Sequence, residues 1–250
     1  MLKNQPLSPH FGAELNAGIE LLHCSDETIE ALKLLVAKEG VLVARNQSMT
    51  PAEQAAFAAR LGELFPSPKP SETVPEGLIQ IKADERSKGA AGTAWHTDVS
   101  SEARPPSISM LRMEVVPPVG GDTLFMDMRQ VFSNLSAKMQ DLLKKLTARH
   151  DPVGHYLYLS GQKALNELPS GHHPIVRQIP ETGDLALYVN EGFTRSIDGL
   201  AESESRFLLR FLFETIRANV PAQIRVKWQP HTIVFWDNRL VQHHAVFDYF

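Results

Sequence analysis

The chain has 250 residues, of which 43% are hydrophobic and 22% charged, a composition typical of a globular domain with a substantial core. Its net charge of −4 argues against a nucleic-acid or membrane-surface partner, and no apolar run is long enough to predict a membrane span or a signal peptide. The single cysteine, Cys24, excludes an intramolecular disulfide and a multi-thiolate metal site. We therefore expect one domain over residues 1–250, located in the cytoplasm, with Cys24 as a small buried apolar residue.

Two helices and a strand are predicted near the N-terminus. A helix is predicted to run to about Lys38, with Ser25 or Asp26 as its N-cap and apolar residues at helical spacing. Gly40 then ends it. The apolar run over residues 41–44 then indicates a buried strand. Thr50-Pro51-Ala52-Glu53 is a capping box with proline at the first helical position, so a second helix is predicted from there to about Leu61.

The middle of the chain has a different character. Residues 66–94 carry proline, serine, lysine, glutamate and glycine with little periodicity, apart from a short strand candidate over residues 78–82. Gly89-Ala90-Ala91-Gly92-Thr93 predicts a loop, which could be a lid over a neighbouring site or a plain surface connection.

From Ser107 onward, short strand-like runs dominate, interrupted by one or two short helices between residues 129 and 148 and a longer helix over residues 203–218. The predicted strands cover residues 108–116, 122–126, 174–179, 185–189, 223–228 and 232–236. Many short strands with a few covering helices predict a mainly β protein with flanking helices, a double-stranded β-helix of the jelly-roll or cupin-like type.

Trp95-His96-Thr97-Asp98 and the distant His243 are the residues that most clearly suggest chemistry. Side chains two residues apart in an extended segment point the same way, so His96 and Asp98 can share a face that an imidazole from another strand completes. Two histidines and one carboxylate suit non-haem Fe(II) and leave coordination positions open. Because this composition gives about one His-x-acid triplet by chance, a structural histidine is the alternative on spacing alone.

Around these residues the chain resembles the taurine dioxygenase family of Fe(II)/2-oxoglutarate-dependent oxygenases over essentially its whole length. Four motifs in the family's order carry the resemblance, namely Trp95-His96-Thr97-Asp98, Pro117-Pro118-Val119-Gly120-Gly121-Asp122-Thr123-Leu124, Val189-Asn190-Glu191-Gly192-Phe193-Thr194, and Trp236-Asp237-Asn238-Arg239 with Gln242-His243. The resemblance implies that Fe(II) and 2-oxoglutarate serve the hydroxylation of a small organic substrate by molecular oxygen, with release of succinate and carbon dioxide. It also implies a possible homo-oligomer, either a dimer or a tetramer.

Residue by residue, the resemblance implies that His96, Asp98 and His243 bind the metal and perform the catalytic role. It implies that the Thr123 hydroxyl bonds a carboxylate of 2-oxoglutarate, and that Asn190 and Phe193 lie at the substrate pocket. For Thr123, the alternative is a β-branched residue that simply fills a strand.

Other residues near these motifs are expected to support the site or to form turns rather than to bind the metal. His244 is a weaker ligand candidate, because neighbouring strand residues face opposite sides. His172 and His173 are interpreted as loop histidines. Trp236 and Asp237 are expected to support the strand before His243, while the Gly120-Gly121 pair predicts a turn with positive φ.

The chain also departs from the family pattern. Family members supply two arginines downstream of the metal histidine, whereas Phe250 lies seven residues after His243, so we expect that a C-terminal segment is missing. No histidine lies between Gly62 and Trp95, where taurine-specific relatives bind the sulfonate. Taurine itself is therefore not expected, while alkyl sulfonates, alkyl sulfates and other small anions stay open. Tyr156, Tyr158 and Leu159 could line a more apolar pocket or be ordinary core residues.

Two other functions stay open on the sequence. A catalytically inactive jelly roll could bind a ligand or a partner chain, and the absent arginines favour this reading. A zinc hydrolase could also use two histidines and a carboxylate, although no general base stands beside the triad in the sequence.

Overall fold

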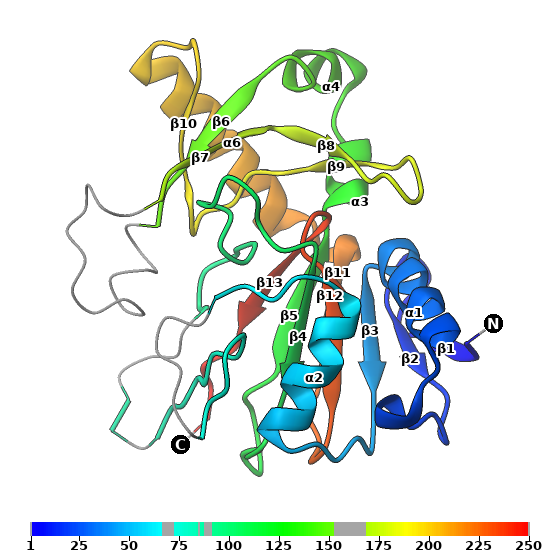
Figure 1. Ribbon diagram of the computed structural model, residues 1–250. Helices are drawn as coiled ribbons and strands as arrows, with labels where there is room; N and C mark the ends of the chain where they lie inside the picture. The colour runs from blue at the N-terminus through cyan, green and yellow to red at the C-terminus, as the bar shows by residue number, and fades with distance from the viewer. Residues whose placement is uncertain (1, 67–72, 85, 88–91, 153–168, 250) are drawn as a thin grey trace.

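Two antiparallel-rich sheets form the body of the protein, seen here in a computed structural model that describes residues 2–66, 73–84, 86–87, 92–152 and 169–249 (Figure 1). The larger sheet has the order β1 (Asn4–Pro6), β2 (Ala13–Leu15), β3 (Val41–Ala44), β12 (Ile233–Asp237) and β4 (Ile108–Arg112). The smaller sheet has the order β11 (Gln223–Val226), β5 (Thr123–Asp127) and β13 (Val241–Ala245). All of these pairs are antiparallel except β2 with β3. The predicted jelly roll is confirmed.

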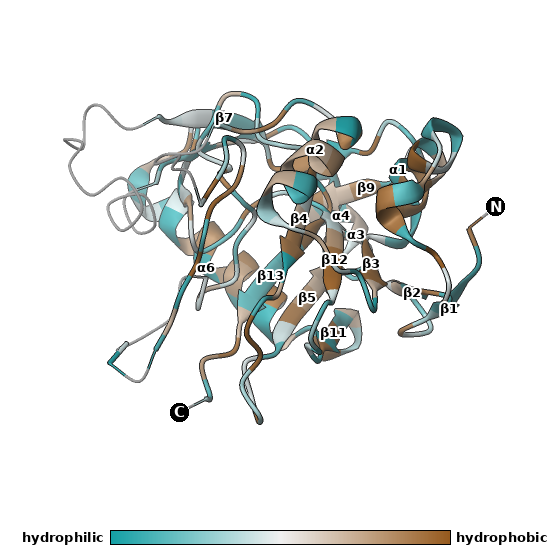
Figure 2. Ribbon diagram, turned by 60° about the horizontal axis from the view of Figure 1, so that its bottom comes forward, coloured by the Kyte–Doolittle hydropathy of each residue, from teal (hydrophilic) through white to brown (hydrophobic). Residues whose placement is uncertain are grey.

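The larger sheet is buried on both faces, and β3 shows why its sequence is apolar throughout. Side chains alternate along a strand. Val41 and Val43 therefore point into the core between the two sheets, and Leu42 and Ala44 point into a second core beneath helices. A continuous apolar run, rather than an alternating one, is the expected signature of such a strand. Figure 2 shows the resulting hydrophobic centre of the molecule.

Both N-terminal helices begin where the sequence predicts. In α1 (Asp26–Glu39) the Ser25 hydroxyl accepts a hydrogen bond from the Thr28 amide, and Gly40 ends the helix with φ of 78°. In α2 (Pro51–Leu61) the Thr50–Glu53 capping box forms in both directions. The short helix η1 (Leu21–His23) precedes α1, and the two longer helices bury their apolar stripes against the outer face of the larger sheet.

A third sheet with the order β10 (Thr194–Ile197), β6 (Thr147–His150) and β7 (Gly171–Pro174) lies beside the two main sheets, together with the hairpin of β8 (Val176–Gln178) and β9 (Leu185–Leu187). The helices of this half are α3 (Met128–Ser133), α4 (Ala137–Leu143), α6 (Glu202–Ala218) and η3 (Val220–Ala222). In Figure 1, α6 runs behind this third sheet. None of the helices in the described residues combines the length and apolarity that crossing a membrane requires.

Several predicted strand boundaries are wrong. Where a strand ends depends on its pairing with distant segments, which the local sequence pattern does not reveal. Residues 78–82 form no strand, since Ile79 and Ile81 are 40% and 57% exposed and find no partner in the described chain. The strand predicted over residues 174–179 is divided, because the backbone of Ile175 bonds to two different neighbours and separates β7 from β8. The strand predicted over residues 108–116 ends at Arg112.

Three further expectations also need correction. The end of the region predicted as helical, residues 129–148, belongs partly to strand β6. On α6 the sequence pattern predicts one apolar stripe of Phe207, Leu208, Phe211, Leu212 and Ile216. Leu208, Leu212 and Ile216 are buried as predicted, whereas Phe207 is 65% exposed and Leu209 is buried instead. Cys24 is only partly buried, packing at the edge of the second core, and burial raises the pKa of its thiol.

Candidate metal centre

A single antiparallel bridge brings together the two histidines that the sequence places 147 positions apart. The His96 amide donates to the His243 carbonyl at 3.1 Å, and the His243 amide donates to the His96 carbonyl at 2.9 Å. Directly opposed residues of such a pair project their side chains to the same side. The two imidazole rings accordingly lie 4.0 Å apart between centroids.

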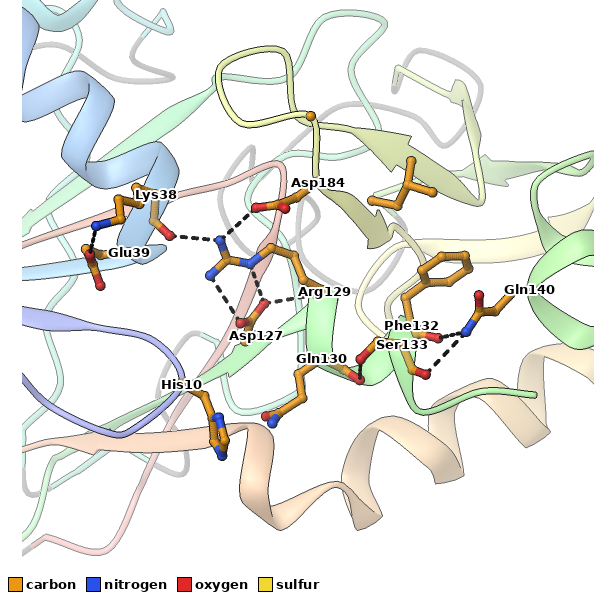
Figure 3. A pocket seen from close by; sticks show the side chains of 12 residues that line it. His10, Lys38, Glu39, Asp127, Arg129, Gln130, Phe132, Ser133, Gln140 and Asp184 are labelled. Carbon is orange, nitrogen blue, oxygen red and sulfur yellow. Dashed lines mark hydrogen bonds and ion pairs between the residues drawn. The ribbon is translucent and has the colours of Figure 1, made fainter. Parts of the chain in front are cut away.

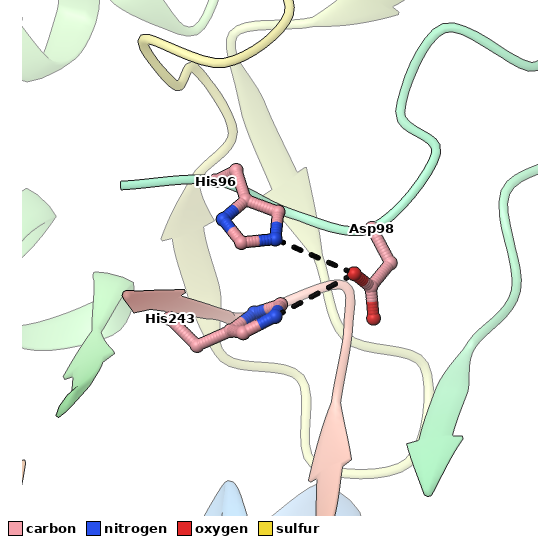
Figure 4. A group of neighbouring side chains, drawn as sticks. All are labelled: His96, Asp98 and His243. Carbon is pink, nitrogen blue, oxygen red and sulfur yellow. Dashed lines mark ion pairs between the residues drawn. The ribbon is translucent and has the colours of Figure 1, made fainter. Parts of the chain in front are cut away.

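Asp98 adds a carboxylate to the same side of the bridge (Figure 4). Its Oδ1 atom lies 3.6 Å from Nε2 of His96 and 3.5 Å from Nε2 of His243. One ligand atom from each of the three residues can be chosen so that all lie within 4.8 Å of one another. The three side chains therefore converge as a metal site requires, with one oxygen and two nitrogens facing a common point.

Hydrogen bonds fix the orientation of the His96 and Asp98 side chains. Nδ1 of His96 donates to the Ala94 carbonyl at 2.8 Å, which leaves Nε2 as the ring atom with an available lone pair. The Ser109 hydroxyl donates to Oδ2 of Asp98 at 2.6 Å, so that Oδ1 is the oxygen turned toward the imidazoles. The bond from Nδ1 raises the basicity of Nε2 of His96, and both bonds hold their ligand in one geometry.

The surroundings of His96 hold its imidazole neutral. Burial and the neighbouring His243, against the opposing effect of Asp98, together lower the pKa of His96 to about 4. The close approach between His96 and Asp98 is therefore not an ion pair near neutral pH, although its distance would allow it. A neutral imidazole is the form that binds a metal ion, so the protonation state fits a ligand role.

Aromatic side chains surround His243 on the side of the main core. The Trp236 ring lies 4.7 Å from the His243 ring, and Phe125 stacks on it at 6.1 Å. His244, the next residue along β13, instead meets the edge of Trp95 at 5.5 Å. His243 and His244 thus have different neighbours, as expected for adjacent strand residues, and the metal-capable group formed by the described residues contains only His243 of the two.

Thr123 begins β5, opposite Ala245 of β13. Its hydroxyl is buried and accepts a hydrogen bond from Nε1 of Trp228 at 3.0 Å. The preceding Gly120 and Gly121 form a turn with φ of 79° and 73°, as the sequence predicts. The amide of Gly121 donates to Asp248 at 2.8 Å, so the turn also fastens the segment that follows β13.

Asn190 and Phe193 are both buried beside the extended segment that carries His96. The Asn190 side chain donates to the Ser100 hydroxyl at 3.1 Å, and its Oδ1 accepts the Phe193 amide at 2.8 Å. Gly192, between them, donates its amide to the Trp95 carbonyl at 3.3 Å. This segment therefore adjoins the candidate metal centre, while the tyrosines and leucine over residues 156–159 lie outside the described residues, as do residues 89–91 of the expected loop.

The interpretation of His172 and His173 as loop residues is wrong, because both lie in β7. His173 is buried and donates from Nε2 to the carbonyls of Ser100 at 2.9 Å and Glu102 at 3.0 Å. His172 is exposed and bonds Asp198 at 2.8 Å. Pairing with β6 makes the strand, and a short Gly-His-His-Pro sequence gives no local signal of it.

Two Asp-x-Arg turns end strands of the two main sheets. At the end of β12 the Arg239 guanidinium forms a two-pronged contact with Asp237, at 3.0 and 2.6 Å, which supports the turn into β13. At the end of β5, Arg129 makes the same contact with Asp127, at 3.0 and 3.1 Å, beside an open surface depression (Figure 3). That depression is lined by none of the three candidate ligands.

Supporting residues that the sequence analysis does not assign are Ser109 and Asn238. Oδ1 of Asn238 accepts the Asp98 amide at 2.8 Å, and its Nδ2 donates to the Asp98 carbonyl at 2.9 Å. Asn238 stands in a recognised motif, so its motif position could have indicated a role, whereas nothing in the sequence around Ser109 does.

A jelly roll in which two imidazoles and one carboxylate converge, one from a strand and two from the extended segment bridged to it, defines the class of non-haem iron dioxygenases that use 2-oxoglutarate. The chain belongs to the taurine catabolism dioxygenase TauD, TfdA family, which matches residues 3–249. The cofactors of this class are Fe(II) and, as co-substrate, 2-oxoglutarate, also called alpha-ketoglutarate.

Similar proteins include an alpha-ketoglutarate-dependent sulfonate dioxygenase of Saccharomyces cerevisiae, 35% identical over 99% of this chain and 63% of the yeast protein. An alkylsulfatase of Acinetobacter baylyi is 31% identical, over 99% of this chain and 81% of that protein. The crystal structure of a putative alpha-ketoglutarate-dependent taurine dioxygenase from Burkholderia xenovorans superposes with a TM-score of 0.83 and 31% identity, covering 99% of this chain and 87% of that one. The chain thus spans less than two thirds of the yeast relative.

Proposed function

We propose that this protein is an Fe(II)/2-oxoglutarate-dependent dioxygenase that hydroxylates a small organic substrate. The observation that carries the proposal is the convergence of His96, Asp98 and His243, whose ligand atoms lie within 4.8 Å of one another. Family membership over residues 3–249 supports the same chemistry. The overall reaction converts a C–H bond, molecular oxygen and 2-oxoglutarate to C–OH, succinate and carbon dioxide.

The donor set fits Fe(II). Two neutral imidazoles and one carboxylate give the ferrous site a net positive charge, and the chelating keto acid is an anion that this charge attracts. When bound, the iron supplies the oxygen activation. The protein holds Oδ1 of Asp98 toward the rings through Ser109 and keeps Nε2 of His96 unprotonated through the Ala94 carbonyl.

Thr123 is proposed to bond a carboxylate of 2-oxoglutarate. Its oxygen already accepts the Trp228 indole N–H, which leaves the hydroxyl proton as the group available to donate. A carboxylate has only acceptor capacity, so a hydroxyl in this state is the matching partner.

Asn190 and Phe193 are proposed to contribute to the wall of the substrate pocket. Support comes from the contact of their segment with the Trp95 carbonyl, one residue before the first histidine. The proposed substrate class is an alkyl sulfonate, an alkyl sulfate or another small anion, supported by the names of the yeast and Acinetobacter relatives. Taurine is the member of this class that the sequence favours least.

A cytoplasmic location and a homodimer or homotetramer are proposed together with this activity, within a single domain. The exposed apolar side chains of α6, with Phe207 at 65% and Phe211 at 38% exposure, support a surface that a second copy covers. Light scattering coupled to size-exclusion chromatography measures the oligomeric state directly, and a monomer would contradict this part of the proposal.

The proposed function is tested by anaerobic addition of Fe(II) and then 2-oxoglutarate, watching for the visible charge-transfer band of a chelated keto acid. Substrate-stimulated succinate release is then measured with alkyl sulfonates and alkyl sulfates. We expect the band in the parent protein and its loss in His96→Ala, Asp98→Ala and His243→Ala. Iron-dependent turnover in all three variants would overturn the assignment of the ligands.

The alternatives give different results in the same experiment. An inactive jelly roll would bind a ligand without consuming 2-oxoglutarate. A zinc hydrolase would release product with Zn(II) in the absence of both oxygen and 2-oxoglutarate.

A further inference from the structure

The backbone is strained at the residue directly after the candidate ligand Asp98. Val99 has φ of 41°, a left-handed conformation that costs free energy for a β-branched side chain. The described residues contain two other non-glycine residues with positive φ, Asn46 and His231, and neither is β-branched. Such strain persists only where many contacts with the surrounding structure hold the backbone in place. We therefore expect the residues after Val99 to be firmly held.

Ser100 is completely buried, and three side chains from other elements hold it in place. Its hydroxyl lies 3.0 Å from Nδ1 of His150 in β6 and accepts from Nδ2 of Asn190 at 3.1 Å. Its carbonyl accepts from Nε2 of His173 in β7 at 2.9 Å. His150 reaches Thr194 with its other ring nitrogen at 3.3 Å, which closes the network.

The residue that packs beneath this turn is Gly171 of β7. A methyl group at Gly171 would lie 2.7 Å from the Glu102 carbonyl oxygen, 2.9 Å from that of Ser101 and 2.8 Å from Nε2 of His173. Those distances are shorter than a carbon atom can occupy without displacing its neighbours, and the backbone carbonyls are not flexible ends. The turn after Asp98 therefore rests directly on the β7 backbone.

On the other side, Asn238 holds Asp98 itself by both its backbone amide and its carbonyl. Asn238 also donates to the Pro106 carbonyl at 3.1 Å, which ties in the far end of the loop. The ligand residue is thus held from the β12–β13 turn, and the residues after it are held from the third sheet.

We propose that Ser100, His150, His173 and Asn190 form a clamp that holds the strained turn at Val99 and thereby aims the Asp98 carboxylate at the metal. They are positioning residues, acting through Asp98, and the inference rests on the proposed function of the triad. The third sheet, which supplies none of the ligands, in this way sets the geometry of the metal centre. Outer contacts of metal ligands typically change metal affinity by about 10–100-fold when removed.

The test uses Co(II), titrated into the metal-free protein and followed by its visible d–d absorption, so that no turnover is needed. Ser100→Ala removes the hydroxyl at the centre of the clamp. Ser205→Ala is the matched control, because Ser205 of α6 is likewise a buried serine, and its hydroxyl accepts the backbone amide of Ile197. Thermal unfolding of each metal-free variant reports the cost to the fold.

We expect both serine variants to lower the melting temperature of the metal-free protein. Only Ser100→Ala should weaken Co(II) binding, by about 10-fold or more, and shift the d–d spectrum. Equal Co(II) affinity for Ser100→Ala and the parent would overturn the clamp, because the parent's own binding shows that the site exists. A parent protein that binds no Co(II) would instead refute the proposed function.

A second pair of variants keeps the test decisive if Ser100→Ala does not fold. His173→Gln preserves a side-chain N–H near the position of Nε2, whereas His173→Leu removes the donor to the Ser100 carbonyl. We expect His173→Gln to bind Co(II) within a few-fold of the parent and His173→Leu to lose about 10-fold or more. The same affinity in both variants would show that His173 serves the fold alone, which contradicts the clamp.

Discussion

In the part of the chain that the structure describes, two pairs of histidines lie ring against ring, and their surroundings differ in kind. His96 and His243 face each other across a backbone bridge, with ring centroids 4.0 Å apart, and Asp98 is turned toward both. His150 and His173 meet edge to face at 5.2 Å, and their ring nitrogens bond protein hydroxyls and carbonyls. Both pairs contain a histidine whose pKa burial lowers, so a low pKa alone does not distinguish them.

What distinguishes the pairs is where the ring nitrogens point. In the first pair the Nε2 atoms converge with a carboxylate oxygen, an arrangement that a cation stabilises. In the second pair the polar atoms complete a network with the backbone and hydroxyls of the protein. A buried neutral histidine is therefore compatible with either role, and the geometry of its acceptors decides between a metal ligand and a supporting residue.

The largest expected effect is a loss of metal affinity, which distinguishes the His96–His243 pair from the His150–His173 pair. Asp98→Ala should weaken Co(II) binding by more than about 100-fold, beyond the range for residues that only support a ligand. The metal-free protein should keep nearly its parental melting temperature, because the Asp98 side chain is partly exposed. Isothermal titration calorimetry with Co(II) measures the affinity, and a loss of only a few-fold would place Asp98 among the supporting residues.

The converse experiment changes the second pair. His150→Ala removes one hydrogen-bond partner from each of the buried Ser100 and Thr194 hydroxyls, which keep only their bonds from Asn190, and it also opens a cavity. We expect the free energy of unfolding to fall by about 3 kcal/mol, which lowers the melting temperature by about 6–12 °C. Calorimetry of the metal-free protein checks this, and an unchanged melting temperature would show that the network contributes nothing to stability.

Acid should destabilise the protein through the same residue. Burial, with a further contribution from His173, lowers the pKa of His150 from its ordinary value of 6.5 to about 3. The unfolded state therefore binds a proton that the folded state does not, so this stability is complete above about pH 6.5 and declines as the pH falls toward 3. Between pH 7 and pH 5 the loss from His150 is about 2 kcal/mol.

Urea unfolding of the metal-free protein at pH 7 and pH 5 measures this loss. His150→Gln is the control, because it has no titrating ring and should lose about 2 kcal/mol less than the parent over the same interval. Equal losses in the two proteins would assign the acid sensitivity to other groups.

The smallest expected effect concerns the co-substrate rather than the metal. Thr123→Val removes the hydroxyl proposed to bond 2-oxoglutarate and should weaken 2-oxoglutarate binding by about 5–10-fold, the equivalent of one hydrogen bond. Co(II) affinity should stay at the parental value. Titration of the anaerobic Fe(II) charge-transfer band with 2-oxoglutarate gives the first affinity, and the Co(II) d–d absorption gives the second. Unchanged 2-oxoglutarate affinity would leave Thr123 as a strand residue that only receives the Trp228 indole N–H.

The sequence predicts those elements whose signals are local. The capping box at Thr50 begins α2, Ser25 caps α1 and Gly40 ends it, because these bonds join residues within one helical turn. The apolar run of β3 predicts burial on both faces, which the two cores confirm. The family and the jelly roll were also recognisable, since four separate motifs occur in order.

The sequence does not predict elements that exist only through distant pairing. β6 and β7 carry no clear alternation, and the Gly-His-His-Pro segment becomes a strand because it pairs with residues 147–150. Residues 78–82 have strand propensity but form no strand. A strand is stabilised by hydrogen bonds to another strand, so propensity alone decides little.

By itself, the sequence determined which residue types could form the candidate site, because the His-x-Asp spacing puts an imidazole and a carboxylate on one side of an extended segment. Only the tertiary structure decided that His243 faces His96 across a backbone bridge and that His244 does not join them. It alone also placed Ser109, Asn238 and the Ser100 network around Asp98. The physical reason is that side-chain direction follows from local backbone periodicity, whereas the contacts that fix a ligand's orientation come from strands and turns far away in the chain.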